Sequence, residues 1–345
     1  MKQTSVNNSS ITRFELNVRV LTWYSLITVL GIIGNGVVMI VVFLSKNINR
    51  TSSFHIAIFS LALTNFMVSL FSLPTYIMST NTFKKYHPQN ISGDLMRKFI
   101  TGYSLQCWLI AASVFLLVFI SIERRNTILH KKLLLLKHKS TKSKIATMVL
   151  IFLIALIKES LGASFIIYDP NGKQFGNFCK YCLDKNKQMI LTICIVILDT
   201  VIPVVIISFC FYQFSLSLKK IGVFLGKSLQ VNKVDIIHVR EVNTVKTIKL
   251  IAVAFCICIL PNRILLVLSS LEVEIMKWNN PISQVFVLMR LSNSFINPLI
   301  FCFQSKQFRQ NLSIVFHQFY KRKRITSRKG KQLSNCFKPL PDMTF

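Results

Sequence analysis

The chain has 345 residues, of which 52% are hydrophobic and 16% are charged. A soluble domain has a more even balance, so this composition excludes a single soluble domain and indicates a protein with many membrane-spanning segments. The formal net charge of +30 would also suit a nucleic-acid-binding protein, but the basic residues gather between the apolar stretches, which favours anionic lipid and an acidic protein partner over nucleic acid.

Seven apolar stretches are long enough to cross a hydrocarbon core of about 30 Å. They predict an all-α membrane protein, a seven-transmembrane helix bundle with spans near 20–45, 53–79, 97–123, 143–167, 188–217, 245–270 and 281–303. The bundle forms one domain, 20–303, and follows a polar N-terminal tail at 1–19. After it, apolar residues at helical spacing predict a short amphipathic eighth helix on the membrane interface, 304–320, and then a basic cytoplasmic tail, 321–345.

Lysine and arginine are concentrated in the loops after the third and fifth spans and in the C-terminal tail. These segments lie on one side of a seven-span topology, and the positive-inside rule makes that side cytoplasmic. The N-terminal tail is therefore predicted to be extracellular. Asn7, Asn8 and Asn90 each begin an Asn-x-Ser sequon on the outer side, which is consistent with a glycoprotein of the plasma membrane.

Several spans contain proline, asparagine or charged residues where lipid cannot satisfy their polar groups. In the seventh span, Pro298 follows Asn297 and frees a backbone carbonyl, which a neighbouring helix or internal water must satisfy. In chain order, the features are Gly34-Asn35, Asn65, Glu123-Arg124-Arg125, Pro203, Pro261, Asn293 and Asn297-Pro298 with Phe301. On seven spans and in this order, they resemble rhodopsin-like (class A) G-protein-coupled receptors over residues 20–320, and the last of them resembles the family's NPxxY segment.

The resemblance implies a receptor that binds an extracellular ligand and activates a heterotrimeric G protein, without catalysis, metal or cofactor. In the family, the arginine matching Arg124 pairs with the preceding acid, here Glu123, and with an acid at the foot of the sixth span. Counting back from the proline of that span, the second acid is Glu241, so Arg124 and Glu241 are a candidate inactive-state latch. The alternative is that both are solvated interface charges.

The resemblance also implies a polar cluster in the middle of the membrane. Buried amides in lipid need hydrogen-bond partners, so a network between helices is expected there. Its members would be Asn35, Asn65, Ser113, Asn293 and Asn297. Where Asn65 stands, the family normally has an aspartate that helps to bind sodium, which puts sodium binding in doubt here.

Other positions depart from the family's pattern. The usual tryptophan of the sixth span is Ile259, the usual tyrosines of the fifth and seventh spans are Phe211 and Phe301, and Arg125 replaces the tyrosine of the Glu-Arg-Arg triplet. The usual cysteine at the outer end of the third span is also absent. Cys179 and Cys182 in the second outer loop therefore lack that partner, and either they bridge each other or one of them reaches Cys107.

Intramembrane charges are the candidate ligand contacts, since leaving them in lipid is costly. The resemblance places Asp199 and Arg263 opposite each other, which predicts a salt bridge, whereas Arg290 has no evident acidic partner. We hypothesise that Arg290, with Arg263, contacts an anionic group such as a carboxylate or a peptide C-terminus. The alternative is an internal network that includes Gln106 and the Asp199 pair.

Three further interpretations concern the neighbourhood of these charges and the ligand. Gln106 stands where amine receptors carry aspartate, which argues against a monoamine ligand. Lys158 and Glu159 in the fourth span are expected to snorkel or to face a neighbouring helix. The sequence identifies neither the ligand nor the G-protein class, and it leaves homo- or hetero-dimer formation open.

Two rival functions stay open. A receptor-like protein without G-protein signalling, serving as a scavenger or a dimer partner, would explain the missing tryptophan and tyrosines. A transporter or channel has less support, because the sequence has no inverted repeat, ring of acids or unwound glycine-rich half-helices.

Overall fold

The computed structural model describes residues 3–45, 52–79, 99, 103–129, 140–168, 179–225, 233–271, 281–306 and 308–318. Side chains at several helix ends, among them those of 3–17 and 233–243, lie outside this description.

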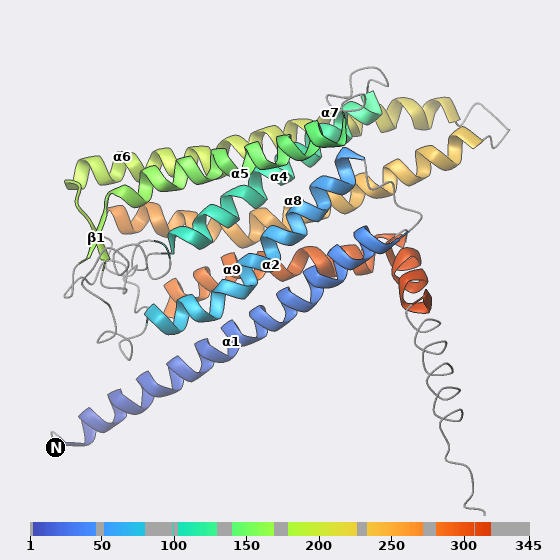
Figure 1. The fold of residues 1–345 in the computed structure, drawn as a ribbon. Coiled ribbons are helices and arrows are strands. Elements are labelled where there is room, and N and C mark those ends of the chain that lie inside the picture. Colours follow the sequence, from blue (N-terminus) through green and yellow to red (C-terminus); the bar gives the residue numbers. More distant parts are fainter. Residues whose placement is uncertain are drawn as a thin grey trace, which may run out of the picture.

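Within the described part of the chain, seven helical segments are long and apolar enough to cross a membrane, which confirms the predicted bundle (Figure 1). Six are the single helices α1 (Gln3–Leu44), α2 (Ser53–Ser79), α4 (Ser104–Leu129), α5 (Thr141–Ser164), α8 (Lys233–Ser270) and α9 (Pro281–Gln304). The fifth span is composite and consists of α6 (Lys185–Val196), the π-helical turn η3 (Ile197–Val201) and α7 (Ile202–Leu225).

Helix α4 runs through the middle of the bundle and contacts α2, α5, α7 and α8. Its side chains Val114 and Leu116 are completely buried, as is Ile259 of α8. The outer helix α5 instead exposes large aliphatic side chains, including Ile157 and Leu161. Exposed aliphatic faces are what a lipid solvent favours, so the core lies around α4 and the periphery faces the membrane.

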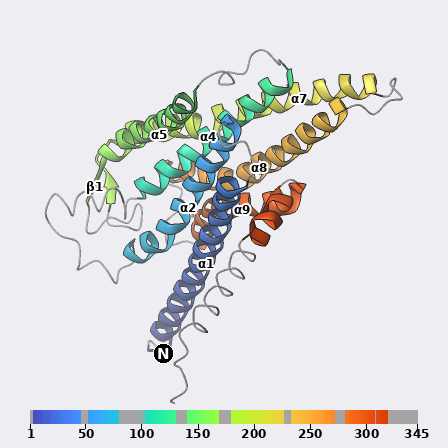
Figure 2. The same ribbon diagram turned by 45° about the vertical axis from the view of Figure 1, so that its right-hand side comes forward.

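Two predicted boundaries in the amino-terminal half differ from the structure. The third span, predicted to begin at 97, begins as α4 at Ser104, because Tyr103 has a φ of 61° that cannot continue a right-handed helix. Helix α1 continues outward from the first span to Gln3, so the backbone of most of the predicted 1–19 tail is helical, and Figure 2 shows α1 projecting beyond its neighbours.

The prolines of the fifth and sixth spans act differently from each other. Pro203 has no N–H to donate, and the helix widens just before it: the N–H of Ile202 donates to the carbonyl of Ile197, five residues back. Pro261 was predicted to interrupt the sixth span, but α8 remains one helix through it. The proline-linked irregularity therefore lies in η3, where it sets the direction of Asp199.

A short antiparallel hairpin lies at the opposite end of the bundle from the C-terminal helix (Figure 1). It pairs β1 (Ile166–Tyr168) with β2 (Cys179–Tyr181), and Cys182 continues the ladder by donating its N–H to Phe165. Cys182 and Cys107 have free thiols, whereas the side chain of Cys179 lies outside the described residues, so the predicted pairing of Cys179 stays a prediction.

Residues 308–318 form a helix that turns away from the axis of α9 (Figures 1 and 2). The hydroxyl of Ser305 accepts a hydrogen bond of 3.1 Å from the N–H of Phe308 and caps its start. Phe308 and Val315 are buried, whereas Arg309 and Phe316 are exposed. The helix is thus amphipathic, within the bounds predicted for it.

Candidate functional site

The outer half of the bundle contains a cluster of four charges centred on the buried Asp199. The Asp199 carboxylate is fully buried, and the Lys158 ammonium lies 2.5 and 2.6 Å from its two oxygens. Arg263 approaches the same carboxylate, with Nη2 3.2 Å from Oδ2. Lys158 also lies 2.5 Å from Glu159. Two cations and two carboxylates from the fourth, fifth and sixth spans therefore balance one another.

The sequence predicted part of this cluster. The expected ion pair between Asp199 and Arg263 is present. Lys158 was expected to snorkel or face a neighbouring helix, and it does the second: its ammonium points inward to Asp199. The opposite charges of the two residues could have predicted this pair, since a lysine and an aspartate on adjacent spans have few other partners in lipid.

Arg290 of α9 is the charge that this cluster leaves uncompensated. Its side chain is buried, and Nη1 donates to the Cys107 thiol at 3.4 Å. Its Nε has no hydrogen-bond acceptor, and no carboxylate of the described residues lies within ion-pair distance of it. Gln106, next to Cys107, is completely buried and keeps both amide atoms unpartnered. Arg290 thus keeps a buried donor, and Gln106 a buried donor and a buried acceptor, without a partner among the described residues.

Two tyrosines border Arg290, and a third stacks on one of them. Tyr24 and Tyr103 are its electrostatic neighbours and share a side-chain hydrogen bond, and the Tyr24 ring stacks on Tyr76 with centroids 4.3 Å apart. Tyr103 is buried and adopts a left-handed backbone conformation, which is strained for a residue with a side chain. Sequence analysis missed all three, because tyrosines at span ends are also ordinary interfacial residues.

The mid-membrane polar network is partly as predicted. The Asn35 amide donates hydrogen bonds of 2.8 Å to the carbonyls of Gly31 and Ser294, and Ser69 donates to Ser294 at 3.0 Å. Ser294, rather than the predicted Asn293, thus joins α1 and α2 to α9. Adjacent residues on a helix point about 100° apart, so the neighbour of the contact residue faces elsewhere.

The other predicted members do not join that network. Ser113 donates to Ile110 of its own helix. Asn65, Asn293 and Asn297 are buried, and each keeps one amide atom without a hydrogen-bond partner among the described residues.

At the cytoplasmic end, the two arginines that follow Glu123 lie against different helices. The Arg124 guanidinium lies 3.6 Å above the centroid of the buried Phe54 ring of α2. Glu123 is buried, accepts a hydrogen bond from Ser53, and has Arg124 and Lys144 as its cationic neighbours. Arg124 is therefore held by an aromatic face as well as by the preceding acid.

Arg125 connects α4 to α7. Its Nε donates to the side-chain oxygen of Gln213, its Nη1 donates to Asn126 at 3.2 Å, and its guanidinium lies 5.6 Å from the Phe209 ring centroid. The sequence identified Arg125 as a departure from the family's pattern but gave no signal for Gln213 as its partner.

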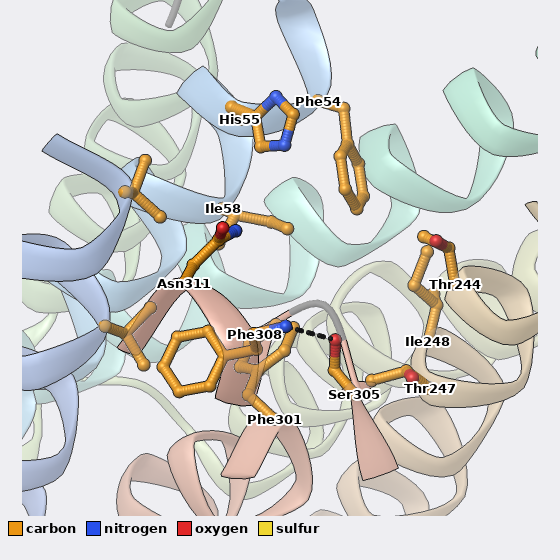
Figure 3. Close-up of a pocket in the computed structure, with 12 residues that line it drawn as sticks. Phe54, His55, Ile58, Thr244, Thr247, Ile248, Phe301, Ser305, Phe308 and Asn311 are labelled. Atoms are coloured by element: carbon orange, nitrogen blue, oxygen red, sulfur yellow. Dashed lines mark hydrogen bonds between the residues drawn. The ribbon is translucent and has the colours of Figure 1, made fainter. Parts of the chain in front are cut away.

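A small cavity of about 60 Å³ lies between the cytoplasmic ends of the helices. Figure 3 shows Phe54, His55 and Ile58 of α2 on one side and Thr244, Thr247 and Ile248 of α8 on another, with Phe301 of α9 and Phe308 of the C-terminal helix between them. The two phenylalanine rings contact each other at 6.0 Å between centroids. Phe301 stands where the family's tyrosine is expected, so this wall of the cavity carries no hydroxyl.

Several predicted residues cannot be placed. The side chains of Glu241, Asn7 and Asn8, and residue Asn90 as a whole, lie outside the described residues, so the latch and the glycosylation sites stay predictions. Within the described residues, no group of three His, Cys, Asp or Glu side chains could hold a metal ion.

Comparison with known proteins agrees with this architecture. Residues 34–301 match the family model of the 7 transmembrane receptors (rhodopsin family). The chain is 24% identical over 306 residues to a QRFP-like peptide receptor of Branchiostoma floridae, covering 84% of this chain and 75% of that protein. It is 23% identical over 316 residues to galanin receptor type 1 of Homo sapiens, covering 85% and 80%. The family consists of receptors and not enzymes, and this multi-pass membrane protein belongs to the rhodopsin family of seven-transmembrane receptors.

Proposed function

We propose that the protein is a plasma-membrane receptor, with its N-terminus outside the cell, that binds an extracellular peptide and activates a heterotrimeric G protein. Membership of the rhodopsin family supports the receptor role, and a relative named as a peptide receptor supports the ligand class. The ligand's identity and the G-protein class are left to experiment.

The single observation that carries the ligand proposal is the uncompensated charge of Arg290. A guanidinium stays protonated in proteins, and burying it without an anionic partner is costly. Arg263 is already engaged by Asp199, so Arg290 alone is the contact for an anionic group of the ligand. Tyr24 and Tyr103, its electrostatic neighbours, are further polar groups at this contact.

The coupling proposal rests on the cytoplasmic end of α4. Arg125 contacts Gln213 of the fifth span, so an outward movement of that span would change this contact. Arg124 lies on Phe54 of the second span, and basic residues concentrate in the flanking inner loops. Such charges attract an acidic partner and the anionic lipid beside it. The proposed Arg124–Glu241 latch would favour the resting state by about 1 kcal/mol, which biases a two-state helix without locking it.

Basal activation of a panel of G proteins, measured in cells at matched surface expression, tests coupling. Glu241→Ala should raise basal activity, and adding Arg124→Ala should remove the rise, because the arginine is needed to engage the G protein. Absence of activation by every variant across all G-protein classes would contradict coupling. It would favour the alternative of a non-signalling binding protein, for which the replacement of the usual tyrosines by Phe211 and Phe301 is the supporting observation.

Peptide pairs that differ only in a C-terminal acid or amide test the ligand contact, using binding to the purified receptor. For a peptide that binds through its carboxylate, Arg290→Gln should weaken the acid form about 30-fold or more, since loss of one partner of a buried charge pair costs about 2 kcal/mol at least. Lys187→Gln is the matched control, because this lysine is exposed near the outer end of α6. Equal effects of the two substitutions would refute the contact.

A further inference from the structure

We propose that Arg290 binds a small inorganic anion, with chloride as the physiological example, when no ligand occupies the receptor. The inference rests on the same guanidinium as the proposed ligand contact, but it concerns the resting receptor and does not require that contact to be correct.

The other charged residues that the structure describes in the outer half of the bundle are already paired with one another. Lys158 and Arg263 are balanced by Glu159 and Asp199, and this quartet accounts for the acids that the described spans place there. Arg290 is left with the thiol of Cys107 as its hydrogen-bond partner. A neutral thiol accepts a hydrogen bond weakly and carries no compensating charge, so no described residue balances the positive charge of Arg290.

Arg290 lies too deep in the bundle for its side chain to reach bulk water. It lies nine residues into α9 from Pro281, which is about 14 Å along the helix, and its side chain is 6% exposed. Snorkelling to bulk water at the helix end is therefore not open to it, and a mobile counter-ion in solution would be too distant to compensate it. Compensation requires an anion that enters the bundle.

The Arg290 guanidinium still has a donor to offer. Its Nε has no hydrogen-bond acceptor among the described residues. Cys107 accepts from Nη1, and Tyr24 and Tyr103 are electrostatic neighbours of the guanidinium. A monatomic anion accepts from Nε without orientation requirements and balances the charge, whereas a cation or an apolar ligand would do neither.

The test uses the purified full-length receptor in lipid nanodiscs without peptide. Thermal unfolding is followed while sodium chloride is replaced by sodium gluconate at constant ionic strength, so that sodium stays fixed. We expect a saturable rise of several degrees in Tm with chloride, reproduced by bromide, since a ligand that binds only the folded state stabilises it. Lys187→Gln should keep the rise, whereas Arg290→Gln should lose it.

An unchanged Tm across the chloride series in the wild-type protein would overturn the proposal, and so would an undiminished rise in Arg290→Gln. If Arg290→Gln does not fold, the wild-type protein alone decides: chloride NMR lines should broaden on adding receptor and sharpen again on adding bromide. Lines that do not broaden refute the site. An anion-dependent Tm together with equal binding of acid and amide peptides would contradict only the proposed ligand contact, and the reverse result would contradict only the resting anion.

Discussion

Replacing Asp199 by asparagine tests whether the charge quartet stabilises the bundle. The substitution keeps the shape of the side chain and removes the one carboxylate shared by Lys158 and Arg263, whose side chains are 15% and 8% exposed. Breaking a buried ion pair by removing one partner costs about 3–5 kcal/mol. Lys158 retains Glu159 as a second partner, so we expect the lower end, about 3 kcal/mol.

The entropy of unfolding is about 2.1 cal/mol/K per residue, so about 3 kcal/mol corresponds here to a fall in Tm of roughly 4 °C, measured by thermal unfolding of the purified receptor in detergent. Asp184→Asn is the matched control on the same span. Asp184 pairs with Lys187 at 3.2 Å, but the two side chains are 81% and 68% exposed, so its loss should cost less than about 1 kcal/mol.

A second variant separates charge from packing. Adding Arg263→Met to Asp199→Asn removes the cation that the first substitution leaves unpaired and should recover part of the lost Tm, because the two positions are in direct contact and their effects do not add. Equal, small shifts for Asp199→Asn and Asp184→Asn would refute the reasoning, since burial would then make no difference to the value of the pair.

Two further substitutions follow from the packing of α1 and α2. Gly31→Ala should lower the Tm, since its new Cβ would lie 1.9 Å from Oγ and 2.6 Å from Cβ of Ser69, and overpacking costs about 1–3 kcal/mol. Gly36→Ala is the control and should change the Tm little, because nothing lies within 4 Å of its new Cβ. Equal shifts of the two variants in thermal unfolding would contradict this reasoning. Phe54→Leu should raise basal G-protein activation about 2- to 30-fold, since it removes a cation–π contact worth about 0.5–2 kcal/mol that holds Arg124 in the resting state. Unchanged basal activity at matched surface expression would show that the ring does not restrain the arginine.

The number and order of the spans were predictable from the sequence because hydrophobic length is a strong signal in a membrane protein. The pairing of Asp199 with Arg263 was predictable because two opposite charges on adjacent spans have few other partners in lipid. The start of α4 was not, since it depends on the positive φ of Tyr103, which residue type does not encode.

Side-chain direction was the other quantity that the sequence did not determine. Ser294, and not the asparagine before it, meets Asn35, and this choice depends on the rotation of α9 within the bundle. The partners of Arg124 and Arg125 depend likewise on which helix packs beside each arginine. Spacing along one chain gives the face of a helix to within about one residue, which is too coarse to assign hydrogen bonds.

The direction of Asp199 depends on the extra residue in the π-helical turn at Ile197–Val201. Such a turn amounts to one extra residue in an α-helix, so removing a single residue there would restore regular winding and rotate everything on its outer side by about 100°. Asp199 would then leave its two cations without any side chain having been substituted. A one-residue deletion in the fifth span can therefore dismantle this charge cluster as completely as replacing its charged residues.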